Sequence, residues 1–405
     1  MTFASTSSVV VYGAREPSFG VVATTGNHQA FRVTGESLKF DLTKEASEEI
    51  NDTRTIDGEV IVNAATSGSI NSEVYYGADF SALLEDVLQS SFVAFGTNGV
   101  GTAVSVDITT TTITASVAPT GNNAFTGLQK GQWFRISSAG ANNGKLLRVS
   151  TTTAPTSTVI TLDTNTPGTA ATGESIQIQS SRLTHGTTKR YWSLERRNTD
   201  IGLFTVYRGQ APSRMSLSFS SGARSTATFD FMGKNSASNT STYLPGTTTA
   251  ASTYNIHAGV GGAVNALWLD GAPATAFFKS ISLSFDNSMR AIDAMNNLGA
   301  VGVGNGTIAL TADVQLYLED ASVYNKFIAN TATSIIFSSI DESGNGYVFT
   351  IPKANLSDYT SNADGKDQEQ MIDATLTALR DSSNATAGLR KAIFIDRVGA
   401  ALTAI

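Results

Sequence analysis

The chain has 405 residues, with 34 acidic and 27 basic side chains, three histidines and no cysteine. The lack of thiols excludes disulfide frameworks, thiolate zinc sites and cysteine nucleophiles. The formal charge of −7 argues against binding to duplex DNA through a basic patch, because phosphate neutralisation needs clustered Lys and Arg.

The first predicted elements are a strand, a polar loop, a second strand and a helix. Residues 37–42 (SLKFDL) and 69–76 form the two strands, in a chain whose abundant Ser and Thr and low charge suit β-structure. A helix is predicted over residues 78–88, because Phe80, Leu83, Leu84 and Val87 recur at helical spacing on one face.

Residues 96–181 differ from both flanks. Charged side chains are sparse there and Thr dominates. Short alternating segments such as residues 132–136 (QWFRI) are separated by turn clusters such as residues 141–144 (ANNG). This pattern predicts a small antiparallel β-barrel or β-sandwich inserted into the main architecture.

The elements after the insert repeat the order found before it. Strands are predicted at residues 191–196, 203–207, 214–220 and 225–232, and residues 235–262 are predicted to be a long linker or loop. Residues 280–286 (SISLSFD) then resemble the first strand. A long polar segment, a strand over 307–318, a short helix near 321–328 and strands at 334–340 and 346–351 follow. A further helix is predicted over residues 368–380.

This order predicts a mainly β fold in which one sheet-plus-helix unit occurs in two tandem copies. The first unit is discontinuous and takes residues 1–95 and 182–234, interrupted by the inserted β-domain at 96–181. The linker at 235–262 leads to the second unit, residues 263–405. Each unit is expected to be a β-sandwich or barrel with a flanking α-helix.

The sequence contains no catalytic, cofactor-binding or metal-binding motif. The histidines His28, His185 and His257 have no partner at metal-ligand spacing and are predicted to be surface or loop residues. Residues 341–346 (DESGNG) begin like a calcium loop, but Pro352 stands where a bidentate Glu is needed, so a hairpin turn is predicted instead. We expect no cofactor, no metal, no enzymatic activity and no membrane insertion.

Several short motifs resemble one known family. They are residues 32–38 (RVTGESL), 47–50 (SEEI), Arg54, 68–70 (GSI) and the helix through Asp86, then 192–196 (WSLER), 231–233 (FMG), 282–287 (SLSFDN) and 344–352 (GNGYVFTIP). Together they resemble the major tail tube proteins of long, non-contractile tailed phages. Residues 125–133 with 142–144 are similar to an extra β-domain that some members carry.

The resemblance implies a structural virion protein whose protomers join edge to edge, so that their inner sheets close into one β-barrel around a channel. Stacked rings would surround the tape-measure protein, meet tail-tip and terminator proteins, and later conduct the phage DNA passively to the host. Such a protein is assembled in the host bacterial cytoplasm. The duplication predicts trimers that form pseudo-hexameric rings, and hexamers are the alternative. An acidic lumen would repel DNA phosphates.

The polar segments 43–54 and 287–305 join the first two strands of each copy. By resemblance they are candidates for ring-to-ring stacking, or else they are ordinary exposed loops. The residues predicted for stacking are Glu45, Ser47, Glu48, Glu49, Arg54, Asn287 and Arg290.

The insert is expected on the outside of the tube, where it would add protomer contacts or bind cell-surface glycans weakly, and nothing in its sequence selects between these roles. The alternative function for the whole chain is a secreted or surface-displayed β-rich adhesin or binding protein. The lack of a signal-peptide pattern at the N-terminus counts against that alternative.

Overall fold

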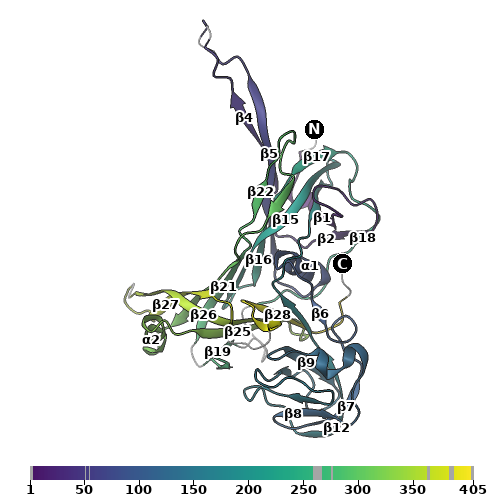
Figure 1. The fold of residues 1–405 in the computed structure, drawn as a ribbon, viewed down its shortest axis with the longest axis vertical. Coiled ribbons are helices and arrows are strands. Elements are labelled where there is room, and N and C mark those ends of the chain that lie inside the picture. The colour runs from purple at the N-terminus through teal and green to yellow at the C-terminus, as the bar shows by residue number, and fades with distance from the viewer. Residues whose placement is uncertain are drawn as a thin grey trace.

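A computed structural model describes residues 3–50, 52–53, 55–258, 267–274, 277–362, 365–382 and 387–402. The molecule is elongated, with a strand hairpin projecting at one end and a compact β-module at the other (Figure 1). The fold is mainly β, as the sequence predicted, and the described elements include two short helices, α1 and α2.

The N-terminal set of elements surrounds helix α1. It consists of β1 (Val9–Arg15), β2 (His28–Ala30), β3 (Gly35–Glu36), β4 (Lys39–Ala46), β5 (Glu59–Glu73), α1 (Ala78–Val87), β14 (Trp192–Asn198), β15 (Leu203–Ser220), β16 (Thr226–Gly233), β17 (Asn235–Asn239) and β18 (Thr248–Thr249).

The C-terminal set surrounds helix α2. It consists of β19 (Leu267–Leu269), β20 (Ala272–Pro273), β21 (Phe278–Asp286), β22 (Arg290–Ile292), β23 (Gly302–Gly304), β24 (Ala309–Tyr317), α2 (Ser322–Ile328), β25 (Thr333–Ile340), β26 (Gly346–Asn362), β27 (Met371–Ala378) and β28 (Phe394–Val398).

One antiparallel sheet runs through both sets. Its strands pair in the order β4–β5–β16–β15–β21–β24–β27–β26, so the boundary between the sets is the β15–β21 pair. A second layer in each set pairs β1–β14–β15–β17 and β19–β25–β26–β28. The long strands β15 and β26 belong to both layers, because each bends from one layer into the other.

The bends occur at matching positions. Register shifts fall between Pro212 and Arg214 in β15 and between Leu356 and Asp358 in β26. The shift in β26 lies 144 positions after the shift in β15. β-Bulges are the usual way for a strand to bend out of a sheet. The sequence predicted two strands where β15 forms one, because the bulge and the positive φ of Gly209 (70°) interrupt the alternation.

The cross-strand pairing matches across the two sets as well. In the N-terminal set, the residues that lie opposite one another across β15, β16, β5 and β4 are, in that order, Ala211, Met232, Ser67 and Lys39. In the C-terminal set, the corresponding residues across β26, β27, β24 and β21 are Asn355, Thr377, Thr311 and Ser284. Residues 37–41 (SLKFD) and 282–286 (SLSFD) therefore occupy the same place in the two ladders.

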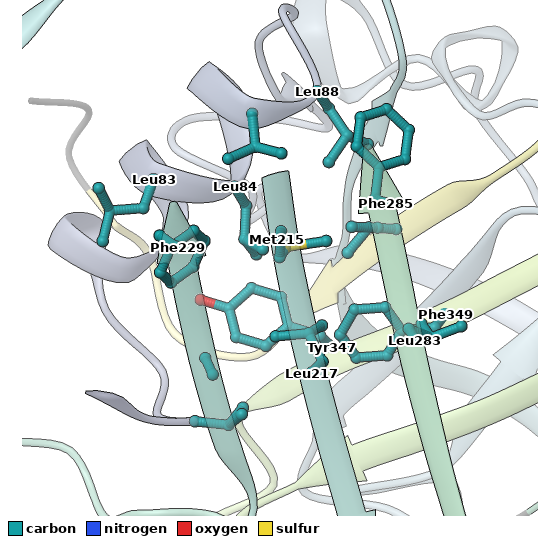
Figure 2. Close-up of a cluster of buried hydrophobic side chains, with 14 of the residues drawn as sticks. Leu83, Leu84, Leu88, Met215, Leu217, Phe229, Leu283, Phe285, Tyr347 and Phe349 are labelled. Carbon is teal, nitrogen blue, oxygen red and sulfur yellow. The ribbon is translucent and has the colours of Figure 1, made fainter. Parts of the chain in front are cut away.

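One core joins the two layers and helix α1. Leu84 and Leu88 point from the helix toward Met215 and Phe285 on neighbouring strands, and Leu83 lies nearer to Phe229 (Figure 2). All three leucines are at most 2% exposed, and burying a side chain of this size stabilises the fold by roughly 1.5–3 kcal/mol. The helix ends at Val87 with Leu88 as its C-cap, after which Gln89 adopts a left-handed conformation (φ 53°). The predicted helix at 78–88 is confirmed, and α2 confirms the one near 321–328.

The inserted segment forms a separate six-stranded sheet with its own core. Its strands are β7 (Val104–Ile108), β8 (Thr112–Ala115), β9 (Trp133–Ser138), β10 (Leu146–Arg148), β11 (Val159–Thr161) and β12 (Ala171–Gln179), in the order β10–β9–β12–β7–β8–β11. A bridge between Val149 and Leu162 connects the two ends of this order. Strands β6 (Val93–Ala94) and β13 (Ser181–Thr184) flank the module and pair with each other.

Two further predicted elements differ from the structure. Residues 371–378 of the helix predicted at 368–380 form strand β27, in which Ile372, Ala374 and Leu376 are buried at every second position. The period of two was present in the sequence, and the strong helix formers around it obscured it. The predicted linker 235–262 begins with strand β17, and its residues 259–262 lie outside the described part of the chain.

Candidate functional site

The continuous sheet has one apolar and one polar face. The core side carries alternate residues such as Leu217, Leu283 and Ala312, which are fully buried. The opposite face carries hydroxyl, amide and acidic side chains from every strand of the ladder. Examples are Asn71, Glu73, Thr228, Asp230, Ser216, Ser218, Ser282, Ser284, Asp286, Thr311, Asp313, Gln315, Asp373, Thr375, Asp358 and Thr360.

Acidic groups outnumber basic ones on this polar face. Arg214 lies opposite both Asp230 and Asp286, and it donates a hydrogen bond of 2.7 Å to Asp286 Oδ2. Burial acts to raise the pKa of Asp286, but the hydrogen bonds from Arg214 and from the Ser288 amide outweigh it, so the pKa is lowered. Burial raises the pKa of Asp230. The carboxylates Asp313, Asp358 and Asp373 add negative charge further along the sheet.

The hydrogen bonds among polar-face side chains are local. Thr375 donates to Asp313 Oδ1 at 2.6 Å, and Gln315 Nε2 donates to Asp373 Oδ1 at 2.9 Å. These hydrogen bonds hold the carboxylates close to the polar face of the sheet. The face therefore presents a hydroxyl-rich, acidic lining.

Both edges of the continuous sheet are open. Among the described residues, β4 pairs only with β5, and the part of β26 from Asn355 onward pairs only with β27. An unpaired edge is a template for a further strand unless it is covered or protected. The sheet can therefore be extended at both of its ends.

The predicted stacking residues before β5 lie on the projecting hairpin of β4 and β5. Glu45 is exposed and opposite Val60, and Ser47, Glu48 and Glu49 follow toward the tip. The Ser47 amide donates to Gly58 O at 2.8 Å, which continues the hairpin pairing beyond the strands. Arg54 lies outside the described residues.

The second predicted stacking segment is also a hairpin, made by β22 and β23. Arg290 is exposed there, and its Nη1 donates to Asn305 O at 3.2 Å. Asn287 is instead only 3% exposed, and its Nδ2 donates to Val87 O at 2.7 Å, at the end of α1. Asn287 thus anchors the hairpin to the helix, and Met295, in the loop between the two strands, is an apolar residue that is 96% exposed.

The inserted module is held by a buried ion pair that the sequence did not predict. Arg182 of β13 donates to both carboxylate oxygens of Asp396 in β28, at 2.7 and 2.6 Å, and to the backbone oxygens of Lys130 and Gly131. The Trp133 amide donates to the same carboxylate at 2.9 Å. The Trp133 and Trp268 rings are 4.5 Å apart at the same junction. No local sequence pattern predicts a pair separated by more than 200 positions.

Two histidines are more buried than predicted. His28 is 4% and His257 0% exposed. Burial lowers the pKa of His257 to about 4, and burial together with the nearby Lys391 lowers that of His185 to about 4. Within the described residues, no cluster of three His, Asp or Glu side chains is arranged to hold a metal ion. The predicted hairpin turn at 341–346 is confirmed, with the Asn345 amide donating to Asp341 Oδ1 at 2.8 Å.

These features define a β-protein with one polar sheet face and two open sheet edges. None of the helices in the described part of the chain is long and apolar enough to cross a membrane.

The family model described as phage tail tube protein matches residues 6–378. The chain therefore belongs to the phage tail tube protein family, whose members are non-enzymatic structural components of the virion. A search of curated proteins gave no match. Family membership favours the tail tube over the adhesin alternative.

Proposed function

We propose that three copies of this chain form a ring of six tube units, that the polar sheet face lines the central channel, and that stacked rings conduct the phage DNA. The single observation that carries the proposal is the matched bending and pairing of the two strand sets. Sequence identity between the sets is low, but β15 and β26 bend at positions 144 residues apart. A ring of three such chains offers six units in nearly equivalent places.

The open edges support ring closure. The β15–β21 pair already joins the two sets side by side within one chain. Repeating this junction between chains would use the free edge of β26 and the free edge of β4. Every inner strand would then be paired, and no edge would remain.

The chemistry of the polar face supports its role as the lumen. A channel for DNA must not hold the phosphates, so acidic and hydroxyl groups suit it better than basic ones. The apolar face is already covered by α1 and the second layer.

The remaining roles follow from position. The β4–β5 hairpin projects from the body (Figure 1), and we propose that it and the β22–β23 hairpin contact the neighbouring ring. We propose the tube-unit boundaries given above, with residues 96–181 as an external module. The tape-measure protein would occupy the lumen before DNA, and tail-tip and terminator proteins would bind the two ends of the stack.

Electron microscopy of the purified protein, with class averages down the particle axis, tests the proposal. Rings or tubes with three peripheral modules around a six-fold-like lumen are the expected result. Six modules would keep the tube and overturn the trimer. Compact monomers at high concentration, with any tail-tip initiator supplied, would overturn the assembly itself.

A further inference from the structure

We propose a residue-level contact between neighbouring copies in the ring. Strand β4 of one copy pairs antiparallel with the free edge of β26 in the next, with Lys39 opposite Thr360. Phe40 then packs against helix α2 of that next copy. The inference rests on the proposed ring and adds its register and its apolar contact.

The template for this contact is the junction inside the chain. There Ser216 of β15 lies opposite Ser284 of β21, and Met215 lies opposite Phe285. Phe285 is fully buried, on the same side of the sheet as the leucines of α1 (Figure 2). Asn287 follows and bonds to the end of that helix.

The matching of the two sets transfers this template to the open edges. By their positions in the two ladders, Lys39 of the N-terminal set corresponds to Ser284 of the C-terminal set, and Phe40 corresponds to Phe285. By the matching bends, Thr360 of β26 corresponds to Ser216 of β15, and Tyr359 corresponds to Met215. Each residue of β26 lies 144 positions after its counterpart. Lys39 therefore falls opposite Thr360, and Phe40 falls opposite Tyr359.

The exposure of the side chains shows what is missing in a single copy. Phe40 is 38% exposed, whereas its counterpart Phe285 is fully buried. Helix α2 has no buried residue, and its Ile328 is 65% exposed. Aligning α2 with α1 by their first or their last residues places Ile328 with Leu84 or Val87, and both of these are 0% exposed.

Helix α2 already occupies the position that the template requires. The ring of Tyr359 packs against Tyr324 at 5.4 Å and Phe327 at 6.0 Å between centroids. Tyr359 thus lies under α2 as Met215 lies near α1. An apolar side chain delivered opposite Tyr359 would cover the exposed flank of α2, which is what Phe40 provides.

Charge fits the same register. Lys39 Nζ lies 2.9 Å from Asp41 Oδ2 in the same strand. In the paired edge, Asp41 is set opposite Asp358, on the polar face. Two opposed carboxylates repel each other, and Lys39, adjacent to both on that face, supplies the compensating cation.

Cross-linking tests the register, because the native chain has no cysteine. A Lys39→Cys, Thr360→Cys double variant, assembled and treated with a short thiol-specific cross-linker, should give covalent dimers and trimers on denaturing gels. The matched control is Lys39→Cys, Asp373→Cys, because Asp373 lies one strand further on the same face, opposite Thr360. Directly opposed residues have Cβ atoms about 5 Å apart, and the next strand adds almost another 5 Å.

A second variant tests the apolar contact. Phe40→Glu should leave a folded monomer that no longer forms rings, whereas Val117→Glu, at an apolar position of the module that is 76% exposed, should assemble normally. If tubes form but the Lys39–Thr360 pair links no better than the control, the register is wrong while the proposed function stands. If the unmodified chain forms neither rings nor tubes, the proposed function itself fails. Normal tubes from Phe40→Glu would overturn the contact with α2.

Discussion

Arg214 and Asp286 form an ion pair of 2.7 Å across the β15–β21 boundary, where the two strand sets meet. The pair stands on the polar face, with side chains 53% and 27% exposed. Exposed ion pairs contribute little stability, since solvent screens the charges. The junction must therefore depend mainly on the backbone ladder and on the apolar contact between Met215 and Phe285 below it.

Replacing Arg214 with Ala should consequently cost at most about 1 kcal/mol of unfolding free energy. The pKa of Asp286 should rise, because the hydrogen bond from Arg214 helps to lower it. Urea unfolding at pH 7 and titration of the Asp286 carboxyl by NMR measure the two effects. Met215→Ala is the comparison variant and should cost about 2–5 kcal/mol, because it opens a cavity in the core. Equal losses of unfolding free energy in the Arg214→Ala and Met215→Ala variants would contradict the conclusion that the apolar contact stabilises the junction more than the ion pair does.

The buried pair of Arg182 and Asp396 should behave differently. Their side chains are 3% and 0% exposed, so Arg182→Ala leaves an uncompensated carboxylate in the interior. We expect a loss of about 3–5 kcal/mol in unfolding free energy. Loss of module docking should also appear as faster proteolysis near residues 96 and 181.

The ion pair of Arg224 and Glu73, in which the arginine is exposed, is the matched control for that experiment. Arg224 is 70% exposed there, and Arg224→Ala should change the unfolding free energy by less than about 1 kcal/mol. A small effect of Arg182→Ala would show that other contacts, such as Trp133 with Trp268, suffice to hold the module.

Local features of the fold could be predicted from the sequence, whereas contacts between distant residues could not. Alternating side chains predicted most strands, and the similarity of residues 37–41 to 282–286 indicated a repeated unit. The polar face could not be assigned, because the β-bulges near Ser213 and Ser357 shift which residues point inward, and bulges have no clear pattern in a Ser- and Thr-rich sequence. The Arg182–Asp396 pair depends on tertiary contacts alone.

Acidification should destabilise the fold through His257. Burial lowers its folded-state pKa to about 4, below the unfolded value of about 6.5. The unfolded chain therefore binds the proton first, so the stabilisation is complete above pH 6.5 and is lost as the pH falls toward 4. At pH 5 the loss from this residue is roughly 2 kcal/mol.

Urea unfolding of the native chain and of His257→Asn, at pH 7.5 and pH 5, measures this effect. The variant should lose less stability between the two pH values, although a slope from His185 remains, because its pKa is also lowered to about 4. Identical pH dependence in both proteins would show that His257 is not proton-linked to folding.

The charge of the polar face gives a prediction about DNA. Asp313 and Asp373 lie on neighbouring strands of that face, and Asp313→Lys with Asp373→Lys would place cations there. We expect assembled tails with slower DNA ejection, and a delay that shrinks as salt rises, because added salt weakens contacts between phosphates and lysines. Fluorescence of a DNA-binding dye, recorded after ejection is triggered at several salt concentrations, follows the rate. Asp107→Lys in the inserted module is the control, because it makes the same kind of Asp-to-Lys change, half as large in total charge, at an exposed position away from the sheet. Equal ejection rates in both variants, with normal tails, would mean that this face does not meet the DNA.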